Sequence, residues 1–352
     1  RFERLDPVPL NVPDLSMTNA PRPSDRSDMN PDPSPDSKPD TKGSDRPWWR
    51  VREKTSVLGI RTLLACHRAF GRTPFRAVLA PVLLFYWCTS PEVRRASLGW
   101  LDRARPERRP AGHREGLAHL ARFAETILDK FAVQAGNDPE VELLVEGDEP
   151  FRNDPPNRGC IILTSHAGCQ ELLSREAGFH TEHPIVVLQH TRHAAEFNRL
   201  LKEAGARPPE VLFREVTGFS PALAMELDEL VARGAYVVVA GDRTPIESDA
   251  KKGTVRVPFF GESARFPTGG ALLALLLKCP LRQMTCTRTA SPSGLRIAYR
   301  VRFDSIEEAP SASRAERAER LEAWMARYAA NLERELARSP YDWFNFYDFW
   351  KT

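Results

Sequence analysis

The chain has 352 residues, of which 28 % are charged and 41 % are hydrophobic, so it is globular in composition and long enough to bury a sizeable core. Its formal net charge is only +3, which excludes the strongly basic character expected of a nucleic-acid-binding protein, and no nucleic acid is predicted as a partner. The longest uninterrupted apolar run, 77–88, has 12 residues and is too short to cross a bilayer, which takes roughly 20 residues.

Residues 1–45 are predicted to be a disordered tail. They contain nine prolines, many Asp and Ser, and almost no periodic apolar pattern. Such a segment cannot bury enough apolar surface to offset chain entropy. The predicted organisation is this tail, a helical membrane-interface region over 46–112 and an α/β domain over 113–352, with 46–352 forming one structural unit.

Residues 48–100 place aromatic side chains beside arginines. Examples are Trp48 and Trp49 near Arg50, and the group Phe85, Tyr86 and Trp87 at the end of the apolar run. Aromatic rings and cations suit the headgroup region of a membrane, so this segment predicts association with a membrane surface. The alternative is a pair of ordinary helices that pack on a sheet. The arginine-rich segment 94–114 suits either an acidic carrier protein or anionic lipid.

From residue 113 onward, apolar runs of strand length alternate with helical patterns. This alternation is typical of βαβ units, and it predicts an α/β fold with a mostly parallel central sheet flanked by helices. The expected strands are 141–145, 160–163, 185–188, 211–213, 236–240, 254–260, 282–288 and 295–303, and the expected helices are 113–136, 195–204, 220–233, 271–278 and 312–338.

The most informative stretch follows the strand at 160–163. His166 lies just beyond the strand, and Glu171 follows five residues later, a His-x4-Glu spacing. Ligands of open α/β sheets bind at the carboxyl ends of strands. Positions i and i+5 of one helix do not face each other, so the pair works only with the His on a turn, and Gly168 supplies the break. A carboxylate on one imidazole nitrogen would let the other accept a proton from a hydroxyl. A histidine that caps the next helix is the alternative.

Three further segments extend this motif. Gly-Asp-Arg-Thr-Pro follows the strand 236–240, Val-Pro-Phe-Phe-Gly occupies 257–261, and Pro-Thr-Gly at 267–269 precedes a helix. In this order, and over about residues 48–350, the motifs resemble the lysophospholipid acyltransferase superfamily and, within it, the lauroyl/myristoyl acyltransferase branch of lipid A biosynthesis. The Gly-Asp-Arg segment departs from the Asp-Gln that is more frequent in lipid A enzymes, which leaves the acceptor open.

The resemblance implies an O-acyltransferase. It would move an acyl chain directly from an acyl thioester, carried by acyl carrier protein or coenzyme A, to a hydroxyl of a membrane lipid or glycolipid. No cofactor beyond this co-substrate and no metal is expected. The expected location is the cytoplasmic face of the inner (plasma) membrane, with the protein peripheral or shallowly inserted.

The same resemblance assigns site residues one by one. His166 is the expected base and Glu171 its partner. Apart from the resemblance, the chemistry of the transfer suggests that backbone N–H groups around Gly168, at the start of the helix, stabilise the oxyanion. The remaining expected substrate contacts are Asp242 and Arg243 in the later loop, Arg214 after the strand 211–213, and Thr268 and Gly269 before the helix.

Other readings have weaker support. No Gly-x-Ser-x-Gly elbow, P-loop or Gly-x-Gly-x-x-Gly is present, which argues against a serine hydrolase and a nucleotide-binding fold. A thioesterase and a non-catalytic, membrane-associated binding module stay open. The six cysteines are expected to be free, buried thiols, and the aromatic segment 341–350 is expected to pack in the core or an interface rather than line an acyl chain. Solvated loop positions are predicted for His180, His183, His190 and His193.

Overall fold

The computed structural model describes residues 71–134, 141–170, 172, 183–189, 211–215, 221–243, 253–293 and 296–351. Several predictions fall outside these residues. They concern the segments 1–45 and 46–70, the helix 195–204, and the residues Cys66, Glu171, His180, His190 and His193. The predicted domain boundary therefore stays a prediction.

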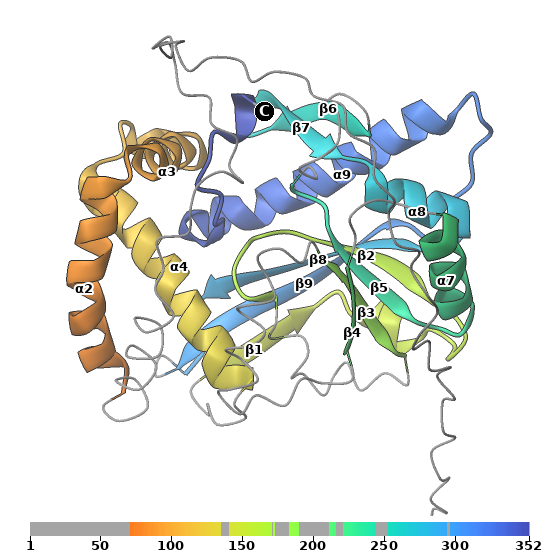
Figure 1. Ribbon diagram of the computed structural model, residues 1–352, viewed down its shortest axis with the longest axis horizontal. Helices are drawn as coiled ribbons and strands as arrows, with labels where there is room; N and C mark the ends of the chain where they lie inside the picture. The colour runs from red at the N-terminus through yellow and green to blue at the C-terminus, as the bar shows by residue number, and fades with distance from the viewer. Residues whose placement is uncertain are drawn as a thin grey trace, which may run out of the picture. The chain divides into compact units, whose positions relative to one another are not determined.

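A seven-stranded sheet forms the centre of the protein, in the order β1-β9-β8-β2-β5-β3-β4 (Figure 1). All neighbouring pairs are parallel except β8 and β9, which are antiparallel. The predicted α/β fold with a mostly parallel central sheet flanked by helices is confirmed. The strands are β1 (Val141–Glu146), β2 (Cys160–Thr164), β3 (Ile185–Gln189), β4 (Val211–Glu215), β5 (Tyr236–Ala240), β8 (Leu281–Thr289) and β9 (Ile297–Glu307).

Helix α9 (Arg317–Arg338) lies across one face of this sheet, over β8 and β9 (Figure 1). The predicted stripe on it is confirmed, because Leu321, Met325, Tyr328, Leu332 and Leu336 are all buried. Helix α8 (Gly269–Leu277) packs on β2, and α7 (Pro221–Ala232) packs on β5. Shorter helices are α5 (Glu149–Arg152) and the 3-10 turns η2 (Pro106–Arg108), η5 (Pro340–Asp342) and η6 (Phe349–Lys351).

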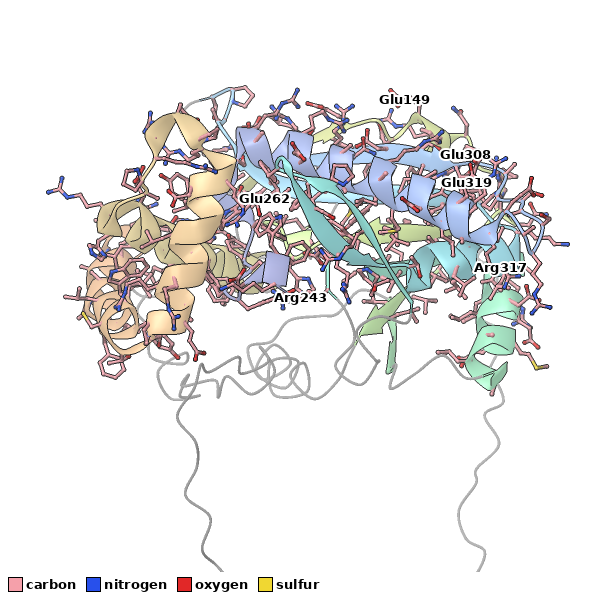
Figure 2. The ribbon with its side chains drawn as sticks, turned by 90° about the horizontal axis from the view of Figure 1, so that it is seen from above. Glu149, Arg243, Glu262, Glu308, Arg317 and Glu319 are labelled. Carbon is pink, nitrogen blue, oxygen red and sulfur yellow. The ribbon has the colours of Figure 1, made fainter. Side chains whose placement is uncertain are left out.

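The segment expected to be a single strand over 254–260 is the first half of a hairpin. Strands β6 (Thr254–Phe259) and β7 (Glu262–Pro267) pair antiparallel and form a separate sheet beside α9 (Figure 2). Their two-residue turn has φ of 51° at Phe260 and 76° at Gly261. Positive φ at both turn positions matches the right-handed twist of the strands. Phe259 and Phe266 are fully buried, so the hairpin contributes its apolar side to the core.

Helices α2 (Arg72–Thr89) and α3 (Pro91–Ala104) both pack on α4 (His113–Gln134). Arg72 binds Asp129 at 2.5 Å, and Arg76 binds Glu125 at 2.7 Å, so ion pairs join α2 to α4. No helix among the described residues is long and apolar enough to cross a bilayer. Large apolar side chains of α2 are nevertheless exposed, namely Val78, Val82, Leu84 and Phe85.

Two predictions about single residues are wrong. His183 is buried instead of solvated, because it lies where the chain enters β3; its Nδ1 donates to the carbonyl of Gly234 at 2.7 Å, and its ring stacks on Tyr236. Cys88 is exposed on α2 instead of buried. The other cysteines in the described part of the chain, Cys160, Cys169, Cys279 and Cys286, are buried thiols outside any disulfide, as expected.

Candidate active site

His166 and Asp242 meet at the carboxyl ends of two neighbouring strands. Strands β2 and β5 are parallel, and Thr164 is in register with Ala240. His166 follows Thr164 by two residues, and Asp242 follows Ala240 by two residues. The register therefore brings together two side chains that are 76 positions apart in the sequence.

The Asp242 carboxylate is held by donors on several sides. Its Oδ1 lies 2.8 Å from His166 Nδ1, and its Oδ2 accepts the backbone N–H of His166 at 2.8 Å and the indole N–H of Trp343 at 3.1 Å. Burial favours the neutral acid, but the charges of His166 and Arg243 and the hydrogen bonds from His166 outweigh it and lower the pKa of Asp242 to about 2. Asp242 is therefore an anion at neutral pH.

This geometry orients the imidazole of His166. An ionised carboxylate can only accept hydrogen bonds, so Nδ1 carries a proton, and in the neutral form of the imidazole the lone pair is on Nε2. The His166 side chain is 37 % exposed, whereas that of Asp242 is 1 % exposed. The imidazole is thus partly exposed to solvent, whereas its carboxylate partner is shielded from water.

Glu171, the expected partner of His166, is not among the described residues, and its role stays a prediction. The structure places the carboxylate of Asp242 at Nδ1 of His166, whereas the sequence predicted that Glu171 would bind one of the two imidazole nitrogens. Asp242 was expected only to line the site. The available signal was that Asp242, like His166, lies two residues after a strand. This signal shows that the two side chains meet only when it is known that the two strands are neighbours in the sheet.

The backbone N–H of Gly168 donates to the carbonyl of Asp342 at 2.7 Å. That N–H groups around Gly168 stabilise an oxyanion stays a prediction. Gly168 has a φ of 57°, and a Cβ there would lie 1.8 Å from the carbonyl oxygen of Cys286. Glycine is required at this position because the turn passes so close to β8.

The other predicted site residues with a described position are Arg243, Thr268, Gly269 and Arg214. Arg243 Nη2 donates to the carbonyl of Phe344 at 2.9 Å. Thr268 is buried and Gly269 begins α8, whose Gly270 packs against the side chains of Leu163 and Val239, near the ends of β2 and β5. Arg214 belongs to β4 and is in register with Leu188 of β3, which is in register with Val239. At about 4.8 Å per strand, its backbone is roughly 10 Å from β5.

Residues 120–352 match the sequence model of the bacterial lipid A biosynthesis acyltransferases. The chain belongs to this family. The matched range contains His166, Asp242 and the C-terminal segment that contacts them, and it confirms the resemblance to the lauroyl/myristoyl acyltransferase branch. A comparison with individual curated proteins found no match.

In this acyltransferase family member, the C-terminal segment closes over the turn that carries His166. Ala167 and Trp343 form an antiparallel bridge, and the N–H of Phe344 donates to the carbonyl of His166 at 3.0 Å. Trp343 and Phe349 are buried in the main core, so the predicted core packing of the aromatic segment is confirmed. The C-terminal segment thus positions the turn that carries His166.

His119 of α4 supports this segment, and sequence reasoning did not find it. Its Nε2 donates to the carbonyl of Trp343 at 2.9 Å, and its Nδ1 accepts from the hydroxyl of Ser97 at 2.8 Å. Burial lowers the pKa of His119 to about 4, against the hydrogen bond to Trp343, which raises it. His119 is therefore neutral at pH 7. Its spacing of four from Phe123, which puts both on one helix face, was the only local signal.

The buried His119 predicts a pH-dependent stability. Its pKa is about 4 in the folded acyltransferase, compared with the ordinary histidine value of 6.5. Below pH 6.5 the unfolded chain binds a proton that the folded chain does not, so stability falls as the pH drops toward 4, by up to about 3 kcal/mol. Urea unfolding at both ends of this range measures the loss. His119→Gln should lose less stability over the same range; an equal loss in both proteins would contradict the assignment.

Proposed function

We propose that the protein is an O-acyltransferase that moves a fatty acyl chain from an acyl thioester to a hydroxyl of a lipid or glycolipid acceptor. The donor is acyl carrier protein or coenzyme A in its acylated form. The observation that carries the proposal is the hydrogen bond between His166 Nδ1 and the buried carboxylate of Asp242, inside the range that matches the family.

The proposed reaction is a direct transfer. The acceptor hydroxyl gives its proton to His166 Nε2 while its oxygen attacks the thioester carbonyl carbon. The Asp242 carboxylate stabilises the imidazolium that forms, as in the serine protease triad. The C–S bond then breaks, the imidazolium returns the proton to the leaving thiolate, and the products are an ester and a free thiol. No acyl-enzyme is formed, so no nucleophilic side chain is needed beside His166.

The same pair would also serve a thioesterase, because the exposed side of His166 can activate water. A radiolabelled acyl thioester incubated with the protein and membrane lipids separates the readings. An O-acylated lipid product supports transfer, and free fatty acid with no lipid product supports a thioesterase. Intact thioester would support a binding module. Lipid mass spectrometry with and without active protein would then identify the acceptor.

We further propose that α2 holds the protein at the cytoplasmic face of the inner (plasma) membrane. On α2 itself, the side chains of Phe75, Leu79 and Trp87 are buried, while those of Leu84 and Phe85 are 55 % and 58 % exposed. The helix contains no acidic residue. An exposed apolar face on a helix without acidic side chains suits insertion into the interfacial region of a bilayer.

Replacing both Leu84 and Phe85 with Glu is expected to weaken association with phospholipid vesicles by at least about tenfold, since burying one large apolar side chain is worth about 1.5–3 kcal/mol. Vesicle cosedimentation measures the effect. Met225→Glu is the control, because Met225 is a 70 % exposed apolar residue on α7. Equal losses in the two proteins, or none in the double variant, would count against α2 as the docking face.

A further inference from the structure

A large cavity lined by arginines lies at the start of the C-terminal segment, the same segment that contacts the turn of His166. It has a volume of about 950 Å³, and its walls come from the residue that follows α3, from α4, η5, the end of α9 and the strands β1, β8 and β9. The wall residues Ser339, Pro340 and Tyr341 directly precede Asp342, whose carbonyl accepts the N–H of Gly168. The arginines in its lining are Arg105, Arg122, Arg288, Arg300, Arg302 and Arg338, and Glu146 is the one carboxylate.

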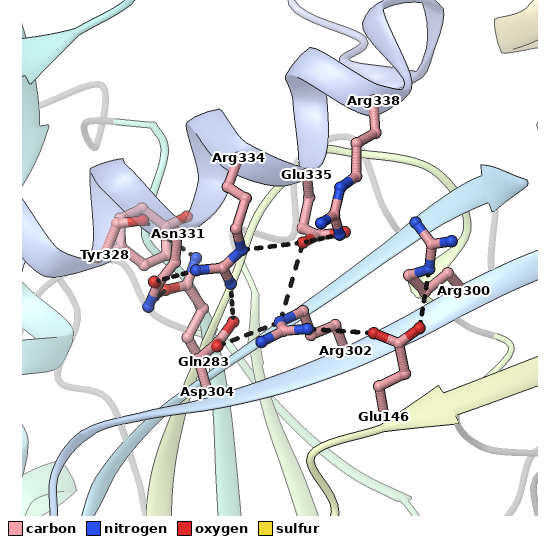
Figure 3. Close-up of polar contacts among 10 residues, drawn as sticks. All are labelled: Glu146, Gln283, Arg300, Arg302, Asp304, Tyr328, Asn331, Arg334, Glu335 and Arg338. Carbon is pink, nitrogen blue, oxygen red and sulfur yellow. Dashed lines mark hydrogen bonds and ion pairs between the residues drawn. The ribbon is translucent and has the colours of Figure 1, made fainter.

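The strand β9 and the end of α9 bring part of this charge together (Figure 3). Side chains alternate along β9, so Tyr299, Val301 and Phe303 enter the core on one face of the sheet. Arg300 and Arg302 extend from the opposite face toward α9. Arg338 extends from the last turn of α9 toward the same space. Three guanidinium groups therefore converge between α9 and the sheet.

The nearby carboxylates are shared among these arginines. The buried Glu335 lies 3.2 Å from Arg338, 3.1 Å from Arg334 and 3.8 Å from Arg302. Glu146 lies 3.1 Å from both Arg300 and Arg302. Only Asp304 adds a further carboxylate to the group drawn in Figure 3, and it also pairs with Arg302 and Arg334. The group in Figure 3 therefore holds four arginines and three carboxylates, which leaves one positive charge in excess. The other three arginines of the lining are each paired with a carboxylate: Arg105 with Glu115, Arg122 with Asp342 and Arg288 with Glu125.

Among the residues that the structure describes, Arg300 and Arg338 also have N–H donors without a protein partner. Each has five N–H donors. Arg338 uses its Nη1 toward Glu335, and its side chain is 51 % exposed. Arg300 approaches Glu146 through Nε and Thr289 through Nη2, the latter at only 3.5 Å. A network that served only to join α9 to the sheet would not need an excess of cations facing an open cavity.

We propose that this cavity binds a group with more than one phosphate. A guanidinium group can donate two parallel hydrogen bonds to two oxygens of one phosphate. A cluster of guanidinium groups therefore favours phosphate over neutral ligands. The volume is at the upper end of small-molecule pockets, which are about 300–1,000 Å³, so a single inorganic ion would leave most of it empty. A soluble phosphorylated nucleotide and the headgroup of a phosphorylated lipid share this chemistry. The site does not depend on the acyl transfer proposed above.

Titration calorimetry with pyrophosphate tests the site. Arg300→Gln and Arg338→Gln should each raise the Kd of pyrophosphate by about tenfold, the expected cost of one lost charge-assisted contact. The matched control is Arg317→Gln, an exposed arginine at the opposite end of α9 (Figure 2), which should bind like the unmodified protein. Thermal unfolding confirms that each variant is folded. No binding by the unmodified protein, or equal Kd values for all of the proteins, would overturn the proposal.

Competition against bound pyrophosphate distinguishes the sources. Displacement by adenosine diphosphate indicates a soluble nucleotide, and displacement only by vesicles that contain phosphatidic acid, compared with pure phosphatidylcholine vesicles, indicates a lipid headgroup. If polyglutamate displaces pyrophosphate while adenosine diphosphate and phosphatidic acid vesicles do not, the cavity binds an acidic protein, and the proposal is overturned.

Discussion

Replacing His166 with alanine is expected to lower turnover by about 10²–10⁴-fold, the usual contribution of a general base. The acceptor hydroxyl then has no group to take its proton, while the binding surfaces are unchanged. Steady-state transfer from a radiolabelled acyl thioester measures the loss. His113→Ala is a matched control, because His113 lies at the start of α4 and contacts Trp87 instead of the site.

The protein should stay folded in this variant. The His166 side chain is 37 % exposed, and its backbone N–H, which also holds Asp242, is kept in alanine. Thermal unfolding therefore checks that any loss of turnover is chemical. Near-full transfer by folded His166→Ala protein would sink the assignment of the base.

Asp242→Asn is expected to lower turnover by about 10³–10⁴-fold, the scale seen when the carboxylate of a serine protease triad becomes an amide. An amide cannot stabilise the imidazolium by charge. Its NH₂ group, when it faces Nδ1, also favours the tautomer that puts the proton on Nε2, where the base must be free. The turnover number per folded molecule, with folded protein quantified by circular dichroism, measures the effect.

Glu171→Gln is the decisive comparison for Asp242→Asn, because it makes the same chemical change at the partner expected from the His-x4-Glu spacing. If Asp242 orients His166, Glu171→Gln should retain much more activity than Asp242→Asn. The reverse order would return the orienting role to Glu171. Some loss of stability is expected in Asp242→Asn. All three partners of this buried carboxylate are N–H donors, and the NH₂ group of asparagine cannot accept a hydrogen bond from any of them.

Local patterns in the sequence determined much of the fold. Short apolar runs predicted β2, β5 and β8 to within a few residues, and helical spacing predicted the buried stripe of α9. Strand and helix periodicities are properties of neighbouring residues, so they can be read without knowing the fold. They also placed His166 just after a strand, and the ordered motifs pointed to the acyltransferase family.

The hairpin β6–β7 shows where local reading failed. The segment 262–267 is polar at its start, with Glu262, Ser263 and Arg265, so it carried no strand signal of its own. It became a strand because β6 offers it a full antiparallel partner and because Ala264 and Phe266 bury against the core. Pairing between strands overrides weak local preference.

Only the tertiary structure decided which carboxylate faces His166. Strand β3 follows β2 in the chain, yet the neighbours of β2 in the sheet are β5 and β8. Crossover connections in a parallel sheet leave the strand order open, so a contact across 76 positions has no signature in local spacing. The same holds for Trp343, His119 and the arginine cavity, whose groups come from segments that meet only when the sheet, α4 and the C-terminal segment are packed together.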